Sequence, residues 1–276
     1  MIVMFVVGGV CLAIFVIYER FFAKVTFIPY RVMTDRTILG ACLTVATVFV
    51  SFYCWDGYYY SYVQVVHNQN IKNTGYIYNI YSIGSCFWAF AVAAAIRATK
   101  RFKWLAVYFG VPVYILGTGL MIHFRQPHVN IGYVIMCQIF IAFAGGTLVI
   151  CEELAIMSAS PHKDVAAALA FLSMFSNIGG GIGSSIAGAI WTNTLPAQLE
   201  KYFPKEEAAL IYSSIVVQLG YEWGTPEREA INAAFGHTQK LMSITGTVIM
   251  VLAFAFVLMW RDIKISDVKN TRGRVL

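Results

Sequence analysis

The stretch IGYVIMCQIFIAFAGGTLVICEELAIM occupies residues 131–157 and carries no charged residue before Glu152. An apolar run of this length is long enough to cross the hydrocarbon core of a bilayer as a helix, since about 20 residues suffice. A lone strand in the same place would leave its backbone polar groups without partners in lipid. The stretch therefore predicts a transmembrane helix.

Six further apolar runs are found along the chain, at about 2–17, 37–63, 76–97, 104–123, 165–192 and 239–260. Hydrophobic residues make up 59% of the sequence and charged residues 12%, whereas a soluble domain has about 25% charged residues. The first run lacks a basic segment before it and a cleavage site after it, so it is interpreted as a span and not as a signal peptide. The sequence therefore predicts an all-α, polytopic membrane protein with seven transmembrane helices.

The basic residues lie in alternate loops between these runs and indicate the topology. The formal net charge is +6. Lys and Arg gather after the first run, in the loop 97–103 and in the tail 261–276, which are therefore expected to be cytoplasmic. This placement argues against nucleic-acid binding. An outside start and an inside end also suggest part of a longer bundle with both ends inside.

Four regions follow from this reading. Residues 1–192 are expected to form six transmembrane helices with short loops. Residues 193–238 are a long, polar extracellular loop, in which apolar residues at near-helical spacing predict an amphipathic helix within 206–219. Residues 239–260 form the last transmembrane helix, and 261–276 form a basic cytoplasmic tail.

The outer ends of the second and third runs are rich in tyrosine and could contact a ligand. Trp55, Tyr59 and Tyr62 share one helical face, and Tyr78 and Asn79 open the third run. One interpretation is an aromatic belt at the membrane interface. The other is a substrate-binding vestibule.

Three carboxylates in the spans are candidates for proton coupling. Asp56 follows Trp55 at membrane depth, where a carboxylate is costly unless it faces a polar cavity or a partner. Glu152 and Glu153 lie about 100° apart on a helix, so at most one of them faces a given cavity. The alternative for this pair is an ion pair with Lys163 or Arg97 at the inner surface.

The sixth run contains small residues at every fourth position, which predicts close helix packing with a hinge or gate role. They form two series, of which the glycines are Gly179 and Gly183 in one and Gly180 and Gly188 in the other. No strand precedes this run, which argues against a phosphate-binding loop. Asn177 is the polar side chain here that is a candidate for substrate contact. The six cysteines form no CxxC pair, and we expect no disulfide, metal site or cofactor.

Several stretches resemble one known family. They are DRTILGACL at 35–43, YYYSYVQVVHNQNIKNTGYIYNIYSIGSCFW at 58–88, RATKRFKWLAVYFGVPVYILGTGLMIHFRQP at 97–127, the region 132–204 and WRDIKISDVKNTRGRVL at 260–276. Together they are similar to the fungal siderophore–iron:proton symporters of the major facilitator superfamily. The resemblance implies the C-terminal half of such a bundle, with spans 8–14 of fourteen.

The resemblance implies a transporter and not an enzyme. It would move ferric siderophores coupled to protons by alternating access, with membrane lipid and an N-terminal half as partners, in a fungal plasma or endosomal membrane. The last extracellular loop is implicated in substrate capture, through the aromatic residues Tyr202, Tyr212, Tyr221 and Trp223. Arg97 and Arg101 match the superfamily's basic cytoplasmic gating loop, although its usual glycine is missing.

Two other classes of protein compete with this interpretation. A seven-helix receptor shares the topology, but the last span lacks an NPxxY motif and the largest loop precedes that span. A related major-facilitator antiporter for glutathione or drugs has the same architecture and remains the alternative.

Overall fold

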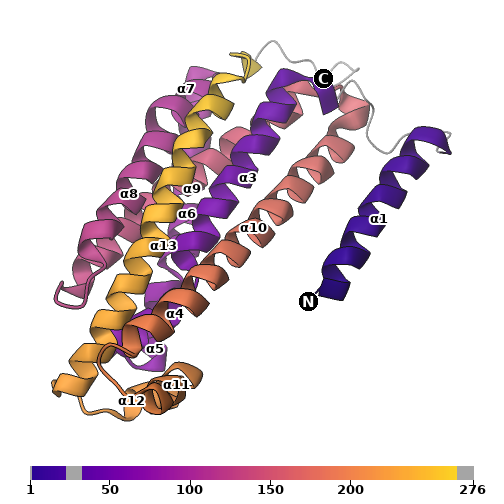
Figure 1. The fold of residues 1–276 in the computed structure, drawn as a ribbon. Coiled ribbons are helices and arrows are strands. Elements are labelled where there is room, and N and C mark those ends of the chain that lie inside the picture. The colour runs from indigo at the N-terminus through magenta and orange to yellow at the C-terminus, as the bar shows by residue number, and fades with distance from the viewer. Residues whose placement is uncertain (1, 23–32, 266–276) are drawn as a thin grey trace.

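The computed structural model describes residues 2–22 and 33–265, and the regular elements of this part of the chain are helices. This agrees with the all-α class expected from the sequence. The helices run side by side along one direction as an elongated bundle (Figure 1). The predicted basic loop after the first span and the predicted basic tail 261–276 lie partly outside the described residues, at 23–32 and 266–276.

Six long apolar segments of the described chain could cross a membrane by their length and composition. They are α3 with α4 (Arg36–Asp56 and Tyr59–Val66), α5 with α6 (Ile71–Tyr78 and Ile80–Thr99), α7, η1 and α8 (Lys103–Leu105, Ala106–Gly110 and Val111–Phe124), α9 (Ile131–Ala159), α10 (Val165–Leu199) and α13 (Pro226–Leu258). They match six of the seven expected spans. The first, 2–17, lies in α1 (Ile2–Phe21), which stands apart from the bundle (Figure 1). The described apolar stretch of α1, Val6–Glu19, is shorter than a span, so the seventh span stays a prediction.

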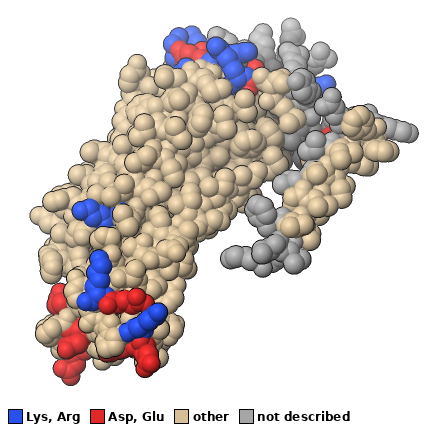
Figure 2. Space-filling view, viewed as in Figure 1, with Lys and Arg blue, Asp and Glu red and all other residues tan. Residues whose placement is uncertain are grey.

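The loops expected to be cytoplasmic lie together at one end of the bundle, where Lys and Arg gather (Figure 2). Arg101 pairs with Asp262 at 2.6 Å, and Arg261 pairs with Asp35 at 3.3 Å. Lys103 Nζ donates to the carbonyls of Leu258 and Trp260, where a cation complements the last carbonyls of α13. Arg97 is exposed in the last turn of α6. We call this the basic end; its place on the cytoplasmic side stays a prediction.

Helix α3 is the centre of the bundle and packs against α9, α10 and α13. Glycines let α10 approach it closely. A Cβ atom at Gly183 would lie 2.6 Å from the Val50 carbonyl oxygen, and one at Gly179 would lie 2.8 Å from Ala46 Cα. A Cβ atom at Gly180 would lie 2.9 Å from the Tyr53 ring. A Cβ atom at Gly188 would meet nothing within 4 Å, so Gly188 takes no part in this packing.

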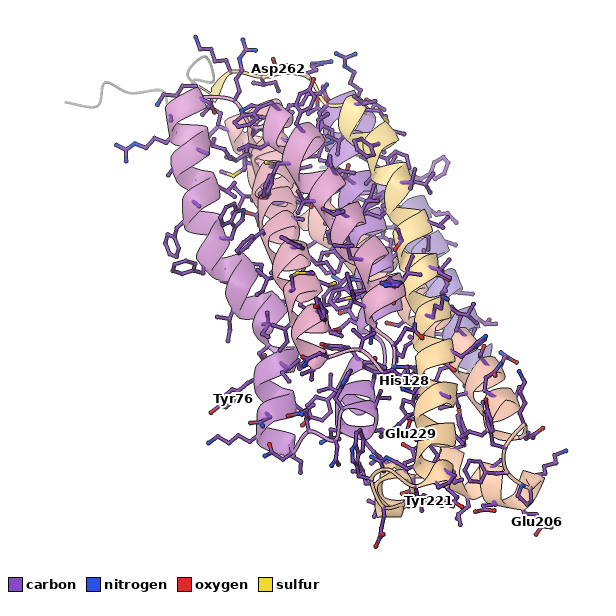
Figure 3. All side chains as sticks on the ribbon, turned by 90° about the vertical axis from the view of Figure 1, so that its left-hand side faces the viewer. Tyr76, His128, Glu206, Tyr221, Glu229 and Asp262 are labelled. Atoms are coloured by element: carbon purple, nitrogen blue, oxygen red, sulfur yellow. The ribbon has the colours of Figure 1, made fainter. Side chains whose placement is uncertain are left out.

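The opposite end of the bundle carries a second group of acidic residues, mixed with Lys and Arg (Figure 2). Figure 3 labels Glu206 and Glu229 there. A second hydrophobic core lies at this end. Both α10 and α13 extend into the region 193–238 that was expected to be a loop: α10 ends at Leu199, and α13 begins at Pro226. The start of α13 is fixed by Thr225, whose hydroxyl accepts from the Arg228 amide. The remaining loop holds two short helices, α11 (Lys205–Ser213) and α12 (Ile215–Gly220). They pack on α10 and α4. We call the residues between α10 and α13, which include α11 and α12, the outer cap.

Candidate functional site

The second span is broken near the end that lies away from the basic end, and this break places a carboxylate. Helix α3 ends at Asp56, and α4 begins at Tyr59 after Tyr58 adopts a left-handed conformation with φ of 60°. Gly57 fits here because a Cβ atom would come within 2.9 Å of Ala187 Cβ on α10. The helical periodicity expected across residues 55–62 is therefore interrupted directly after Asp56.

The carboxylate of Asp56 faces the tyrosine-rich start of the third span. Tyr78 Oη donates to Asp56 Oδ2 at 3.0 Å, and the Tyr60 ring meets the Tyr78 ring edge-on. Asp56 and Tyr60 are half-buried, and Tyr78 is exposed. Neighbouring Asn79 donates its amide to Gly75 of its own helix. The structure thus brings the two tyrosine-rich ends together at Asp56, on a face that is open.

Trp55, Tyr59 and Tyr62 are fully buried inside the bundle, so they contact no open cavity in this conformation. They surround Arg125, which follows α8 and is also fully buried. The guanidinium carbon lies 4.4 Å from the ring centroid of Tyr59 and 5.0 Å from that of Tyr62. Burial lowers the pKa of Arg125, while the two tyrosines and Asp56 act in the opposite direction. The sequence offers one signal for Arg125, as the single Lys or Arg of the loop 124–130, and this by itself indicates only topology.

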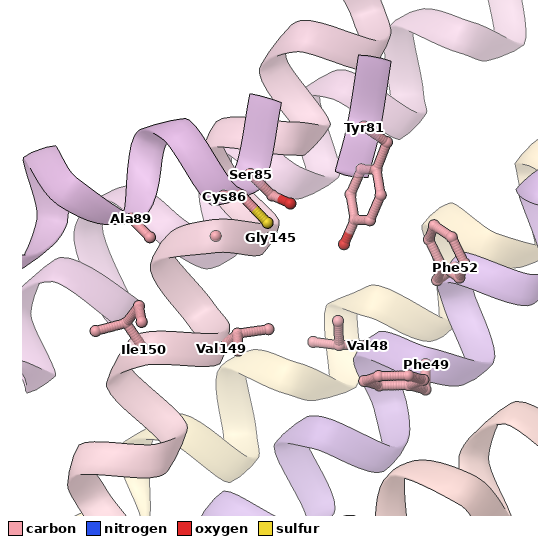
Figure 4. Close-up of a pocket in the computed structure, with 11 residues that line it drawn as sticks. Val48, Phe49, Phe52, Tyr81, Ser85, Cys86, Ala89, Gly145, Val149 and Ile150 are labelled. Carbon is pink, nitrogen blue, oxygen red and sulfur yellow. The ribbon is translucent and has the colours of Figure 1, made fainter. Parts of the chain in front are cut away.

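A pocket of about 310 Å³ lies between α3, α6 and α9 (Figure 4). Its walls are mainly apolar and aromatic, with Phe49, Phe52 and Tyr81 among them, and Ser85 adds a hydroxyl. A side chain at Gly145 would meet the Tyr81 hydroxyl at 2.5 Å, so the glycine preserves room for the tyrosine. Asp56 and Tyr78 lie about one helical turn further out than Phe52 and Tyr81. The half-buried carboxylate and the pocket therefore lie along one side of α3 and α6.

Glu152 is buried on α9, only 1% exposed, and neither carboxylate oxygen has a hydrogen-bond partner among the described residues. It lies one helical turn from Val149, which lines the pocket. Glu153 is exposed. The expected ion pair of this acidic pair with Lys163 or Arg97 is not formed in the described chain. The structure thus separates the two glutamates, and Glu152 is the one that lies inside the bundle.

The other predicted contact residues lie away from the pocket. Asn177 is exposed and donates to Ser173 of its own helix. Tyr221 Oη donates to Glu207 Oε1 at 2.9 Å within the outer cap. The guanidinium carbon of Arg228 lies 5.7 Å from the ring centroid of Trp223. Tyr212 is half-buried and Tyr202 is exposed on the cap. Figure 3 shows Tyr221 at the outer end, far from Asp262 at the basic end. Tyr221 thus makes a contact within the cap, and Trp223 makes one between the cap and α13.

His67 follows α4, and its side chain is partly buried. Its ring meets the Tyr62 ring edge-on, and its buried Nε2 has no hydrogen-bond partner among the described residues. Burial, followed by the charge of Arg125, lowers the pKa of His67 to about 4, whereas an unfolded histidine titrates near 6.5.

The unfolded chain therefore binds a proton on His67 before the folded one does, and stability falls as the pH decreases from about 6.5 towards 4. We expect the thermal midpoint of the purified chain to decrease less between pH 7.5 and pH 5 in His67→Gln than in wild type. His128→Gln changes an exposed histidine and serves as the control. An equal decrease in wild type and His67→Gln would contradict the prediction.

The chain is similar to proteins named as transporters. No protein-family model matches the chain. It is 54% identical over 276 residues to an MFS siderochrome iron transporter 1 of Ajellomyces capsulatus, covering 99% of this chain and 47% of that protein. It is 42% identical to the siderophore iron transporter mirB of Emericella nidulans, covering 99% of this chain and 46% of the relative. The chain thus spans about half the length of the curated relatives it matches.

A solved structure shows the same fold at low sequence identity. It is a bacterial homologue of the human lysosomal transporter Spinster, in an inward-facing and unoccupied conformation. The TM-score is 0.59 at 16% identity, over 83% of this chain and 48% of the other. This coverage fits one half of a major-facilitator bundle, as the sequence predicted. Over nearly its whole length, the chain is homologous to about half of a fungal MFS siderochrome iron transporter.

Proposed function

We propose that this chain forms the C-terminal half of a transporter that moves ferric siderophores across a membrane, coupled to protons, by alternating access. The observation that carries the proposal is the similarity over 99% of the chain to relatives named as siderochrome iron transporters. In transporters built from two repeats, substrate binds near the bilayer midplane between the repeats. An N-terminal half is therefore the expected partner, and the open side of α3 and α6 is the face for the substrate.

The pocket has features that suit one wall of a substrate site. Its volume of about 310 Å³ is at the lower end of the range for small-molecule sites, about 300–1,000 Å³. Aromatic rings provide flat apolar contacts, and the hydroxyls of Tyr81, Ser85 and Tyr78 provide hydrogen bonds to a ligand rich in oxygen. We therefore move the proposed substrate contacts from the buried Trp55, Tyr59 and Tyr62 to these open residues.

Glu152 and Asp56 are the proposed proton carriers. A carboxylate inside a membrane protein is costly when ionised, so it binds a proton unless a partner compensates it. Glu152 has no such partner among the described residues, and Asp56 has the Tyr78 hydroxyl on an open face. Glu153 is exposed to the surroundings and drops out of the proposal.

The test is uptake of labelled ferric hydroxamate by cells that lack other siderophore transporters and express this chain joined to the first half of a relative. We expect Glu152→Gln and Asp56→Asn to bind substrate but to lose the dependence of uptake on the external pH, because neither amide can carry a proton. Glu153→Gln, one position along α9, is the matched control and is expected to keep that dependence. Unchanged pH dependence in both variants would exclude these carriers.

The same cells distinguish the alternative. Export of glutathione or of drugs without uptake of iron would favour the antiporter, but the names of the relatives favour siderophore iron. The membrane itself, plasma or endosomal, and the cytoplasmic side for the basic end are also part of the proposal. Protease or cysteine-labelling maps that placed the outer cap and the basic end on one side would contradict this topology.

A further inference from the structure

Arg125 is a buried charge that the described ion pairs leave without a carboxylate partner. Its side chain is fully buried, and the two ion pairs of the described chain, both at the basic end, do not include it. Its Nε and Nη2 atoms have no hydrogen-bond partner among the described residues. Burial of an unpaired charge is expensive, so the position of Arg125 requires a compensating contact.

Part of this compensation comes from the break between α3 and α4. The last carbonyls of a helix lack donors within the helix, and the Trp55 carbonyl accepts from Arg125 Nη1 at 2.5 Å. The Gly57 carbonyl accepts from Gln239 Nε2 of α13 at 3.4 Å. Asp56 therefore lies between two carbonyls that are each held by a side chain from another part of the bundle.

The rings of Tyr59 and Tyr62 hold the guanidinium on its other side, at the cation–π distances given above. A cation over an aromatic face gains about 2 kcal/mol or more when it is desolvated. Both rings belong to α4, the helix that follows the break. Arg125 thus contacts the carbonyl before Asp56 and the side chains after it, and it joins the α8–α9 loop to both sides of the break.

The electrostatic surroundings of Asp56 contain one full charge. Tyr78 donates to its carboxylate, and Tyr59, Tyr81 and Tyr114 lie within electrostatic range of it. These hydroxyls are neutral at physiological pH, since tyrosine titrates near 10. α13 faces the break with the neutral Gln239 amide. Arg125 is the charged side chain that contacts the backbone next to Asp56, through the Trp55 carbonyl.

We propose that Arg125 is a positioning residue for Asp56: it fixes the helix break on which the carboxylate stands and places its positive charge at the residue before it. The inference rests on the proposed role of Asp56 in proton exchange, which it deepens. In transport, Arg125 would set the pH at which Asp56 takes up its proton. Lysine in its place keeps the charge but not the planar contact with both rings.

The test uses the full purified chain in detergent and a carbodiimide, which reacts with protonated carboxyl groups. The labelled fraction of Asp56 is read by peptide mass spectrometry at a series of pH values. For Arg125→Met we expect the labelling midpoint of Asp56 to move about one pH unit upwards, or about tenfold in proton affinity, because loss of a nearby positive charge favours the protonated acid. Arg125→Lys is expected to move it by less, and the labelling of Glu152 is the internal reference.

Two matched controls separate charge from structure. Arg101→Met removes a positive charge from an exposed ion pair at the basic end. Gln239→Leu removes the hydrogen bond to the Gly57 carbonyl at the break without a change in charge. Both are expected to leave the Asp56 midpoint in place. An unmoved midpoint in folded Arg125→Met, or an equal shift in either control, would overturn the inference. The labelling measures protonation of Asp56 in the purified chain and needs no transport. Failure of the uptake experiment would therefore contradict the proposed function without contradicting this inference.

Discussion

Alanine at Gly179 is expected to separate α10 from α3 and to destabilise the bundle by about 3 kcal/mol, because overpacking of a tight contact costs of that order. The new methyl group would meet the carbonyl oxygen of Ala46 and lie 2.9 Å from its carbonyl carbon. These are backbone atoms, so no side chain can rotate away. The whole of α10 must move instead. The gain of about 1 kcal/mol from replacing a helical glycine by alanine is too small to compensate.

Gly181 is the matched control, since it lies two residues further along the same helix with open space around it. Gly181→Ala is expected to keep or slightly raise the thermal midpoint of the purified chain, whereas Gly179→Ala lowers it. Size-exclusion profiles in detergent verify that both variants remain dispersed. Equal midpoints for the two variants would show that the close contact between α10 and α3 is absent in solution.

Replacement of Arg228 by methionine is expected to release the outer cap from the bundle. Arg228 is 1% exposed, and its guanidinium donates to the carbonyls of Val65 in α4 and Gln218 in α12. Methionine fills similar space but leaves both buried carbonyls without these donors, at about 1–3 kcal/mol each. A short helix such as α12 has little stability of its own, so we expect this loss to appear first in the cap.

Hydrogen exchange read by mass spectrometry locates the effect. Amides of 205–220 are expected to exchange faster in Arg228→Met, while those of α3 and α9 keep their protection. Arg101→Met, which breaks an exposed ion pair at the other end, controls for the loss of a charge and is expected to change little, as exposed pairs contribute about 0–1 kcal/mol. Uniformly faster exchange in Arg228→Met would mean that the cap and bundle unfold as one unit.

Much of the fold was predictable from apolar length alone. The six runs that match long helices could be found because lipid forces each crossing segment to satisfy its own backbone, so one local rule identifies it. The ends of the helices were less predictable. α13 was expected from 239 and begins at Pro226, because an amphipathic extension beyond the membrane is held by the second core and has no long apolar run.

The candidate site was predictable in its residue types and less so in their placement. Asp56 and Tyr78 were candidates, and they do form a hydrogen bond. Trp55, Tyr59 and Tyr62 were assigned to one helical face as substrate contacts, yet the left-handed Tyr58 breaks the helix and Arg125 draws both tyrosine rings inward. Arg125 lies 70 residues after Trp55 in the sequence. No spacing rule connects residues so far apart.

The sequence by itself determined that this chain is a helical membrane protein, where six of its spans lie, and that two adjacent glutamates cannot share one environment. The tertiary structure alone decided that Glu152 is the buried member, that Gly179 and not Gly188 meets α3, and that a buried arginine supports the break beside Asp56. The physical reason is that apolar length and helical angle are local properties, whereas burial and pairing depend on which other helix comes to lie alongside.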